Sequence, residues 1–272
     1  MTTVLHISDT HFGTEVTPVC EALTALAHER RPDVLVYSGD ITQRAYQSQF
    51  AAARAFCDGL GIGRMLCLPG NHDVPLFNLA ARLWHPYRGY LRYFGPELEP
   101  VLDLPDLLVI GVKTTRRMRH KNGVVSQAQV ERVAGRLAAA RPGQLRIVVT
   151  HQPAAVSRAR DEHDRLRGGQ AALDAWAAAG ADLVLGGHIH LPYVMDATQA
   201  SDAFPPSRPL WCVQAGTAVS SRVRHGTVNS VNLVSWQAPL PDAPRHCVVQ
   251  VCEFDHATGR FVARPEQRLQ LD

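Results

Sequence analysis

Short apolar runs alternate with longer amphipathic segments over the first two thirds of the chain. Residues 18–30 carry Val19, Leu23 and Leu26 at helical spacing, and residues 48–60 also have a helical pattern. Apolar runs of four or five residues flank these segments and are typical of buried strands: residues 4–8, 34–37 and 65–68. Strands that alternate with helices in this way predict parallel βαβ units.

The middle of the chain is less regular, and the last third consists mostly of strands. We expect two short helices within residues 76–94 and a helix that Ser126 caps. A helix is also expected at 169–179, and strands at 101–104, 107–112, 145–150, 182–185, 192–195, 210–214, 228–236, 247–254 and 261–263. Residues 203–209 and 238–244 are expected to be loops. Since there is no internal repeat or low-complexity linker, we interpret residues 1–272 as one domain.

Five of the apolar runs end in clusters of Asp, His or Asn. The clusters are Asp9-Thr-His11, Gly39-Asp40, Gly70-Asn71-His72-Asp73, His151 and Gly187-His188-Ile-His190. In open α/β sheets, ligand-binding groups gather outside the carboxyl ends of the strands, so one structural assumption brings all five clusters together. Gly-Asn-His-Asp is the most specific of them, because four such residues after an apolar strand serve no packing purpose.

The residue types in these clusters are those that bind Zn, Mn and Fe ions. Seven side chains qualify: Asp9, His11, Asp40, Asn71, His151, His188 and His190. Seven ligands are too many for one ion that keeps an open position, but they suit two ions that share a carboxylate. If strand alternation continues through each Asp-x-His or His-x-His pair, both side chains of the pair point the same way.

The order of these motifs, from Asp9 to His190, resembles that of the calcineurin-like metallophosphoesterases. Within that superfamily, Ile7-Ser-Asp-Thr-His11 and Gly187-His-Ile-His190 resemble the bacterial class III cyclic-nucleotide phosphodiesterases and related glycerophosphodiesterases. Gln214-Ala-Gly-Thr217 is a weaker point of similarity. The resemblance implies an α/β fold, in part α+β: a four-layer αββα sandwich of two mixed β-sheets flanked by helices. It also places a dimetal site at the C-terminal ends of the strands.

The same resemblance implies a role for each motif residue. One ion is expected on Asp9, His11, Asp40 and His190, and the other on Asp40, Asn71, His151 and His188, with Asp40 bridging. His72 is expected to face the substrate phosphate, together with Asn71, and to protonate the leaving oxygen or stabilise the transition state. Asp73 either orients His72 or buttresses the loop.

The implied reaction is hydrolysis of a phosphate ester by in-line attack of a hydroxide that bridges the two metals, which sit about 3.5–4 Å apart in such sites. The resemblance favours Mn or Fe as the divalent ions. Zn and Co stay open, because nitrogen and oxygen ligands without thiolate accept all four.

The composition of the chain limits the kinds of partner that we expect the protein to bind. The formal net charge is +3, so charge gives little support to a nucleic acid as partner. The six cysteines include no CxxC pair and are interpreted as free thiols, while the chain shows neither an export signal nor an apolar run of about 18–20 residues. We therefore expect a cytoplasmic protein without a membrane partner. The resemblance suggests a homodimer.

Substrate selection is expected outside the motifs. The basic stretch 113–121 is a candidate phosphate-binding loop, with Arg116 as the candidate substrate ligand, although a solvated basic loop would look the same. Arg222-Val-Arg224-His225 is a second basic candidate. The aromatic residues between Trp84 and Phe94 either pack in the core or form a pocket wall.

Three classes of function fit these observations to different degrees. The favoured one is a phosphodiesterase that acts on a small cyclic nucleotide or glycerophosphodiester. A nuclease, a phosphomonoesterase or a pyrophosphatase could use the same metals, but a nuclease calls for a broad basic surface. A non-catalytic scaffold of the same fold would be expected to lose metal ligands or His72, and this sequence keeps them.

Overall fold

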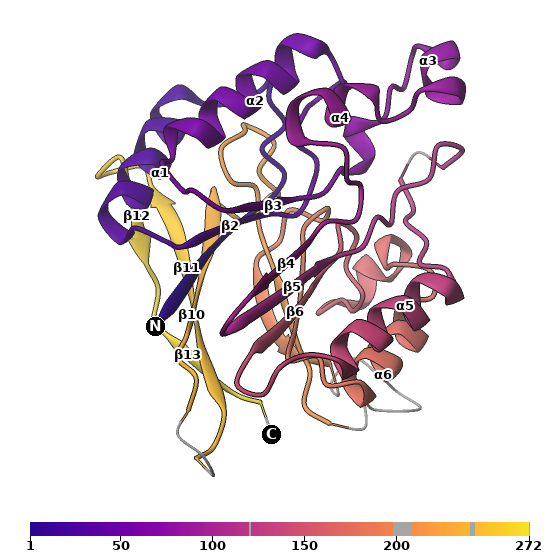
Figure 1. The fold of residues 1–272 in the computed structure, drawn as a ribbon. Coiled ribbons are helices and arrows are strands. Elements are labelled where there is room, and N and C mark those ends of the chain that lie inside the picture. Colours follow the sequence, from indigo (N-terminus) through magenta and orange to yellow (C-terminus); the bar gives the residue numbers. More distant parts are fainter. Residues whose placement is uncertain (120, 198–207, 240–242, 272) are drawn as a thin grey trace.

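Two mixed β-sheets lie face to face in the computed structural model, with helices outside both (Figure 1). The structure describes residues 1–119, 121–197, 208–239 and 243–271. Helices α1 (Thr17–Arg30), α2 (Gln47–Gly59) and α4 (Arg88–Phe94) cover the first sheet, and α5 (Gln127–Ala138) and α6 (Gly169–Ala178) cover the second. This is the four-layer sandwich that the resemblance of the motifs implied.

The first sheet combines the N-terminal strands with the C-terminal ones. Its strand order is β12-β11-β10-β1-β2-β3, and β13 pairs with β11. Pairing is parallel from β1 to β2 and from β2 to β3, and antiparallel between β1 and β10 and beyond. The strands are β1 (Thr2–Ile7), β2 (Val34–Tyr37), β3 (Met65–Cys67), β10 (Ser230–Trp236), β11 (His246–Asp255), β12 (Arg260–Ala263) and β13 (Gln267–Gln270).

The second sheet is built from the middle of the chain. Its order is β4-β5-β6-β7-β9-β8, with parallel pairing from β5 through β6 and β7 to β9 and antiparallel pairs at both edges. The strands are β4 (Val101–Leu104), β5 (Leu107–Gly111), β6 (Leu145–Val149), β7 (Leu183–Gly186), β8 (Tyr193–Asp196) and β9 (Trp211–Gln214). The predicted turn between the first two of these strands is present.

Strand alternation divides the core into three apolar layers. Val34 and Val36 of β2 point toward the second sheet, whereas Leu35 and Tyr37 point toward the helices on the first sheet. All four side chains are buried, which is why β2 reads as a continuous apolar run rather than an alternating one. The apolar layer between the two sheets fixes their relative position. The loops at their common edge therefore start from fixed points.

Most element boundaries agree with the sequence prediction within two residues. The two short helices expected within residues 76–94 are α3 (Leu79–Trp84) and α4. The strand β13 was missed, as were two 3₁₀ turns, η1 (Asn71–Asp73) and η2 (Ala159–Asp164). Residues 203–207 and 240–242 of the two expected loops lie outside the described residues. All six cysteines are unpaired, as expected, and five of them are buried.

Within the described part of the chain, none of the helices combines the length and the apolar character that crossing a bilayer requires.

The predicted cap of α5 offers a direct test of the local analysis. Ser126 accepts a hydrogen bond from the backbone N–H of Gln129, and the Gln129 side chain accepts one from the backbone N–H of Ser126. We expect Ser126→Ala to lower the free energy of unfolding by about 1 kcal/mol, because this reciprocal cap is lost. Urea denaturation measures the change. Ser126→Asp, which keeps a cap acceptor, should unfold like the wild type, and equal losses in both variants would contradict the assignment.

Candidate metal centre

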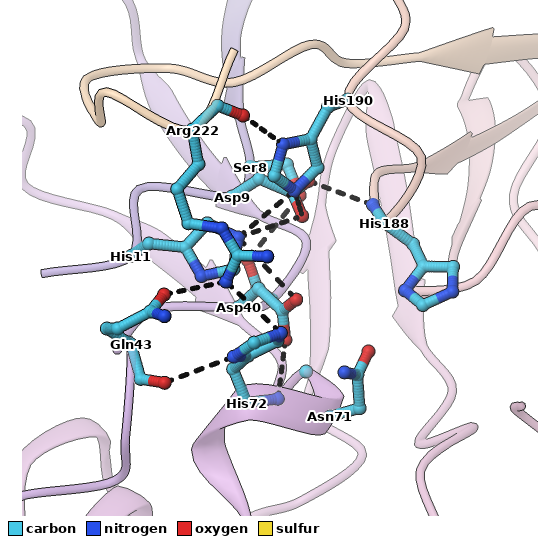
Figure 2. A network of polar contacts seen from close by, with 12 residues as sticks. Ser8, Asp9, His11, Asp40, Gln43, Asn71, His72, His188, His190 and Arg222 are labelled. Carbon is cyan, nitrogen blue, oxygen red and sulfur yellow. Dashed lines mark hydrogen bonds and ion pairs between the residues drawn. The ribbon is translucent and has the colours of Figure 1, made fainter. Parts of the chain in front are cut away.

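The five polar clusters meet at the carboxyl ends of five strands. Figure 2 shows residues from four of these clusters side by side, among them Asp9, Asp40 and His188. Strands β1, β2 and β3 of the first sheet deliver Asp9, His11, Asp40 and Asn71. Strands β6 and β7 of the second sheet deliver His151, His188 and His190. The site therefore lies across the junction of the two sheets, as the strand-end argument predicted.

The ligand-bearing loops leave the strand conformation as soon as each strand ends. Asp9, His11, Asp40, His188 and His190 all have left-handed backbones, with φ of 52°, 42°, 50°, 74° and 56°. Such φ values are uncommon outside glycine, and they persist only where the surroundings impose them. The expectation that strand alternation orients these pairs is therefore wrong, because the pairs lie in loops and not in strands.

The consequence is clearest for the histidine pair after β7. The His190 ring lies near Asp9, with 3.2 Å between His190 Nε2 and Asp9 Oδ1. The His188 ring instead lies beside His151, with ring centroids 5.2 Å apart. The two rings point toward different parts of the site (Figure 2). His188 and His190 are two residues apart in the sequence but belong to two separate clusters.

The first cluster is formed by Asp9, His11 and His190. His11 Nε2 lies 3.1 Å from His190 Nε2 and 3.7 Å from Asp9 Oδ1. Ligand atoms that share one ion at about 2.0–2.2 Å are separated by roughly 3.0–3.6 Å. The three atoms are thus already spaced for a common ion.

The second cluster is formed by Asp40, Asn71, His151 and His188. His151 Nε2 lies 3.3 Å from Asp40 Oδ1 and 3.2 Å from Asn71 Oδ1. His151 Nδ1 is 2.8 Å from the carbonyl oxygen of Ser38, which can only accept. The proton therefore sits on Nδ1, and Nε2 is the nitrogen offered to an ion.

Asp40 belongs to both clusters. Its Oδ2 lies 3.8 Å from His11 Nε2, while its Oδ1 faces His151 and accepts a hydrogen bond from the His72 backbone N–H at 2.8 Å. This is the arrangement that a bridging carboxylate requires. The bridging role predicted for Asp40 fits the geometry.

Glycines allow the loops to approach this closely. A side chain at Gly70 would overlap with the backbone and carboxylate of Asp40, and one at Gly187 would overlap with Ser8 and Asp9. Gly39 has a φ of 106° and lies against the His151 ring. The glycines in the three motifs are therefore needed for space as well as for backbone freedom.

The charge states of the buried groups suit metal binding. Burial lowers the pKa of His11 to about 3, and burial together with His151 lowers that of His188 to about 4, so both rings are neutral. Burial alone would raise the pKa of Asp40, but His151 and His72 outweigh it and hold this pKa well below its usual range. Neutral imidazole and ionised carboxylate are the forms that bind metal ions.

His151 behaves differently, because it lies against Asp40. Burial opposes protonation of its ring, but the Asp40 carboxylate raises the pKa of His151 to about 9. An ion that binds to Nε2 must therefore displace a proton, and metal affinity should rise with pH.

Several polar atoms at the site are buried and make no hydrogen bond. Among the described residues, these are both ring nitrogens of His188 and Asp9 Oδ1, which His190 Nε2 approaches to 3.2 Å as an ion pair. Leaving such groups unsatisfied costs about 1–3 kcal/mol each. Their position within the two clusters fits metal ions as the missing partners, so the residues present match the expected cofactor.

His72 is held beside the clusters with one ring nitrogen facing inward. Its Nδ1 donates to the carbonyl oxygen of Gln43 at 3.1 Å, which leaves Nε2 for the pocket. Arg222 reaches the same place: its guanidinium lies 3.4 Å from His72 Nε2 and donates to the Gln43 side chain at 2.7 Å (Figure 2). The backbone carbonyl of Arg222 also accepts a hydrogen bond from His190 Nδ1.

Asp73 buttresses the loop that carries Asn71 and His72. Its carboxylate accepts hydrogen bonds from the backbone N–H groups of Gly70, Ile41 and Thr42 at 2.8–3.0 Å. It thereby joins the loop after β3 to the loop after β2. Of the two roles expected for Asp73, the geometry favours this one.

A pocket of about 360 Å³ lies over the clusters. Three cationic side chains line it, Arg44, Lys121 and Arg222, in addition to His72 and four of the candidate ligands. Lys121 is held by Asp164 at 2.7 Å. Of the two basic candidate segments, residues 113–121 thus contribute Lys121, and the segment after β9 contributes Arg222.

Arg116 does not line this pocket. Its guanidinium donates to the carbonyl oxygens of Lys113 and Thr115 and, at 2.7 Å, to the side chain of Gln129. These bonds fix the basic loop to the start of α5. We therefore correct the assignment of Arg116 as a substrate ligand. Its side chain holds the basic loop against α5.

Gln43 and Arg222 are the site residues that sequence analysis left without a role. Gln43 lies three residues after Asp40 of the Gly39-Asp40 motif. The neighbouring sequence gives no indication that its side chain belongs to the site. Arg222 was suspected only as part of a basic segment. Its approach to His72 depends on the return of the chain between β9 and β10, which spacing alone does not reveal.

Comparison with known proteins supports this picture at the level of the family and the fold. A family model described as calcineurin-like phosphoesterase matches residues 2–192, which include every candidate ligand. No curated protein matches the chain.

Solved structures of phosphatases are similar in fold. The purple acid phosphatase PPD1 from yellow lupin (Lupinus luteus) seeds has a TM-score of 0.70 at 12% identity, with 99% of this chain and 53% of that chain covered. A dimetal phosphatase from Danio rerio has a TM-score of 0.65 at 11% identity, with 100% and 99% covered. A structure described as PhoD has a TM-score of 0.68 at 10% identity, with 100% and 70% covered. The chain thus spans about half the length of the lupin protein.

Close packing of Gly70 against Asp40 gives a test of the site geometry. We expect Gly70→Ala to weaken Mn²⁺ binding by at least about tenfold, since the added methyl group must displace the bridging residue. Titration calorimetry with Mn²⁺ measures the effect. Gly63→Ala is the matched control, because a side chain at this exposed glycine meets nothing within 4 Å. Equal affinities in the two variants would contradict the arrangement of the loops.

Proposed function

The chain belongs to the calcineurin-like phosphoesterase family, and we propose that it is a phosphodiesterase that uses two metal ions to hydrolyse a small diester. The observation that carries the proposal is the pair of ligand clusters sharing Asp40, with His72 Nε2 and the Arg222 guanidinium beside them. The class of substrate proposed is a cyclic nucleotide or glycerophosphodiester, with Mn or Fe as the ions.

The ions would be held by the two clusters, with Asp9, His11 and His190 on one side of Asp40 and Asn71, His151 and His188 on the other. When bound, such ions supply hydroxide near neutral pH and neutralise charge on the phosphoryl oxygens. The protein contributes fixed geometry: the anchored imidazoles and the left-handed loops hold the ligand atoms in place before any ion arrives.

His72 is the proposed proton donor to the leaving oxygen. Because Nδ1 donates to the Gln43 carbonyl, a second proton on the ring can only sit on Nε2, the nitrogen that faces the pocket. When that proton is present, the Arg222 guanidinium must leave its 3.4 Å contact with Nε2, because a guanidinium has no acceptor. The backbone N–H of His72 is bonded to Asp40, which fixes the donor relative to the bridging carboxylate. Proton delivery thus occurs from a fixed position.

Arg222 is the proposed phosphate ligand. Its guanidinium is oriented by the Gln43 side chain, and a phosphoryl oxygen between it and the metal clusters would receive a charge-assisted hydrogen bond. Lys121 and Arg44 add positive charge to the same pocket. These positive charges stabilise the transition state, in which negative charge builds up on the phosphoryl oxygens.

The size of the pocket supports a small substrate. A volume of about 360 Å³ lies at the low end of the range for small-molecule sites. The formal charge of +3 likewise gives a polymeric nucleic acid little general attraction. The complete ligand set argues against a non-catalytic scaffold.

Replacement of His72 separates catalysis from metal binding. We expect His72→Ala to lower kcat by about 10²–10⁴-fold, the usual contribution of general acid catalysis, while the variant keeps both ions. Steady-state kinetics and elemental analysis of the same sample measure the two effects. His256→Ala, in an exposed turn, is the control. If His72→Ala loses metal in proportion to activity, His72 is a ligand and the proposed role is wrong.

A substrate panel tests the diesterase assignment. Mn-loaded protein would be assayed with bis(p-nitrophenyl) phosphate, p-nitrophenyl phosphate, 3′,5′- and 2′,3′-cyclic AMP, glycerophosphoethanolamine and single-stranded DNA. We expect higher kcat/KM for a small diester than for the monoester or the DNA. Asp40→Ala serves as the inactive control, because Asp40 lies between the two clusters, 3.8 Å from His11 and 3.3 Å from His151. A strong preference for the monoester would overturn the diesterase assignment and leave the metal site intact.

A further inference from the structure

A second and larger groove opens beside the metal pocket. Its volume is about 1180 Å³, and it is lined by residues just after β2, by the segment that follows η1, and by α3 and α4. Arg44 lines both the groove and the metal pocket. The two cavities therefore lie on either side of one arginine side chain, which places the groove next to the metal pocket.

The lining of the groove carries positive charge only. Arg44, Arg88, Arg92 and His85 are part of it, and neither Asp nor Glu is among the lining residues that the structure describes. The guanidinium groups of Arg44 and Arg88 make no hydrogen bond or ion pair within the described ranges; Arg44 lies over the Phe77 ring, 5.2 Å from its centroid. Uncompensated arginines in a groove suit an anionic occupant.

Aromatic side chains stand exposed along the same groove. Tyr46 is 57% exposed, Phe77 is 74% exposed and Trp84 is 72% exposed. Other aromatics of this region, Tyr87 and Tyr90, are buried and account for the packing of α4. The exposed rings therefore have no role in the core, and their position among arginines provides planar surfaces for stacking.

We propose that this groove is a subsite for a nucleotide unit, so that the preferred diester joins two nucleotides rather than closing a ring within one. This inference rests on the proposed diesterase function and changes its preferred substrate, from a cyclic nucleotide or glycerophosphodiester to a linear dinucleotide. A nucleotide combines a planar base, which stacks on aromatic rings, with a phosphate, which pairs with arginine. An acyl chain would use the rings but not the charges, and a glycerol group would use neither.

The chemistry is that of the proposed diesterase. A linear dinucleotide places its internal phosphodiester over the metal clusters and its second nucleotide, with a terminal phosphate, in the groove. The hydroxyl of water becomes bonded to phosphorus, the bond from phosphorus to the leaving ribose oxygen breaks, and that oxygen takes a proton. Two mononucleotides are released.

The double variant Trp84→Ala/Arg88→Ala tests the subsite, since both side chains are exposed and lie outside the metal pocket. The substrates are a linear adenosine dinucleotide with a 5′-phosphate and bis(p-nitrophenyl) phosphate, which is too short to need the groove. We expect KM for the dinucleotide to rise about tenfold or more, the effect of losing one stacked base, while kcat/KM for the aryl diester changes less than about twofold. Arg136→Ala, an exposed arginine on α5, is the matched control for charge.

Binding in EDTA separates the subsite from catalysis. Calorimetry with the same dinucleotide should show binding to wild-type protein that is at least about tenfold weaker in the double variant. If the wild type cleaves the aryl diester but the double variant handles and binds the dinucleotide like wild type, the subsite is wrong and the diesterase proposal stands. If no diester is cleaved but binding is lost in the double variant, the diesterase proposal fails and the subsite stands.

Two further outcomes would overturn the subsite. One is a larger loss for an acyl-bearing glycerophosphodiester than for the dinucleotide, which would assign the rings to a lipid. The other is a wild-type dimer that the double variant converts to a monomer in sedimentation, which would make the groove a contact between two copies of the chain.

Discussion

The buried carboxylate of Asp40 is the constraint on which the site depends. Taking a carboxylate out of water is costly unless its surroundings compensate for the lost hydration. Here the compensation comes from both sides, from His151 and His11, and from the backbone N–H of His72. Each of these partners stands on a different loop. The position of Asp40 therefore fixes the relative position of three loops, and the metal clusters follow from it.

The loops reach this position by adopting strained backbone conformations. Five of the seven candidate ligands have left-handed φ, a conformation that costs of the order of 1–3 kcal/mol where it is strained. The sandwich beneath can sustain this cost because its middle layer holds a large, buried apolar cluster. Asp73 adds local support by tying two of the loops through backbone N–H groups. The stable core of the sandwich thus allows the ligand-bearing loops to keep strained backbone conformations.

The buried strands and the meeting point of the motifs could be predicted from the sequence for a physical reason, whereas the four layers were implied only by the resemblance of the motifs. Burial on both faces of β2 and its neighbours gives short apolar runs, and the rule on strand ends places the polar clusters together. Side-chain directions were not predictable, since the loops abandon strand geometry after Ile7 and Gly186. The strand β13 was missed because only Leu269 of its four residues is buried. Arg116 was chosen over Arg222 because charge density is visible in a sequence, whereas a returning loop is not.

Each ligand cluster takes residues from both sheets: Asp9 and His11 meet His190, and Asp40 and Asn71 meet His151 and His188. An ion in either cluster would consequently cross-link the two sheets, in addition to the hydrogen bonds from His151 to Ser38 and from the His188 backbone N–H to Asp9 that already join them at this edge. Ligands that bind only the native state raise its stability with their free concentration. The lifetime of the protein in a cell would then follow the supply of the metal, so that scarcity would reduce the amount of enzyme as well as its activity.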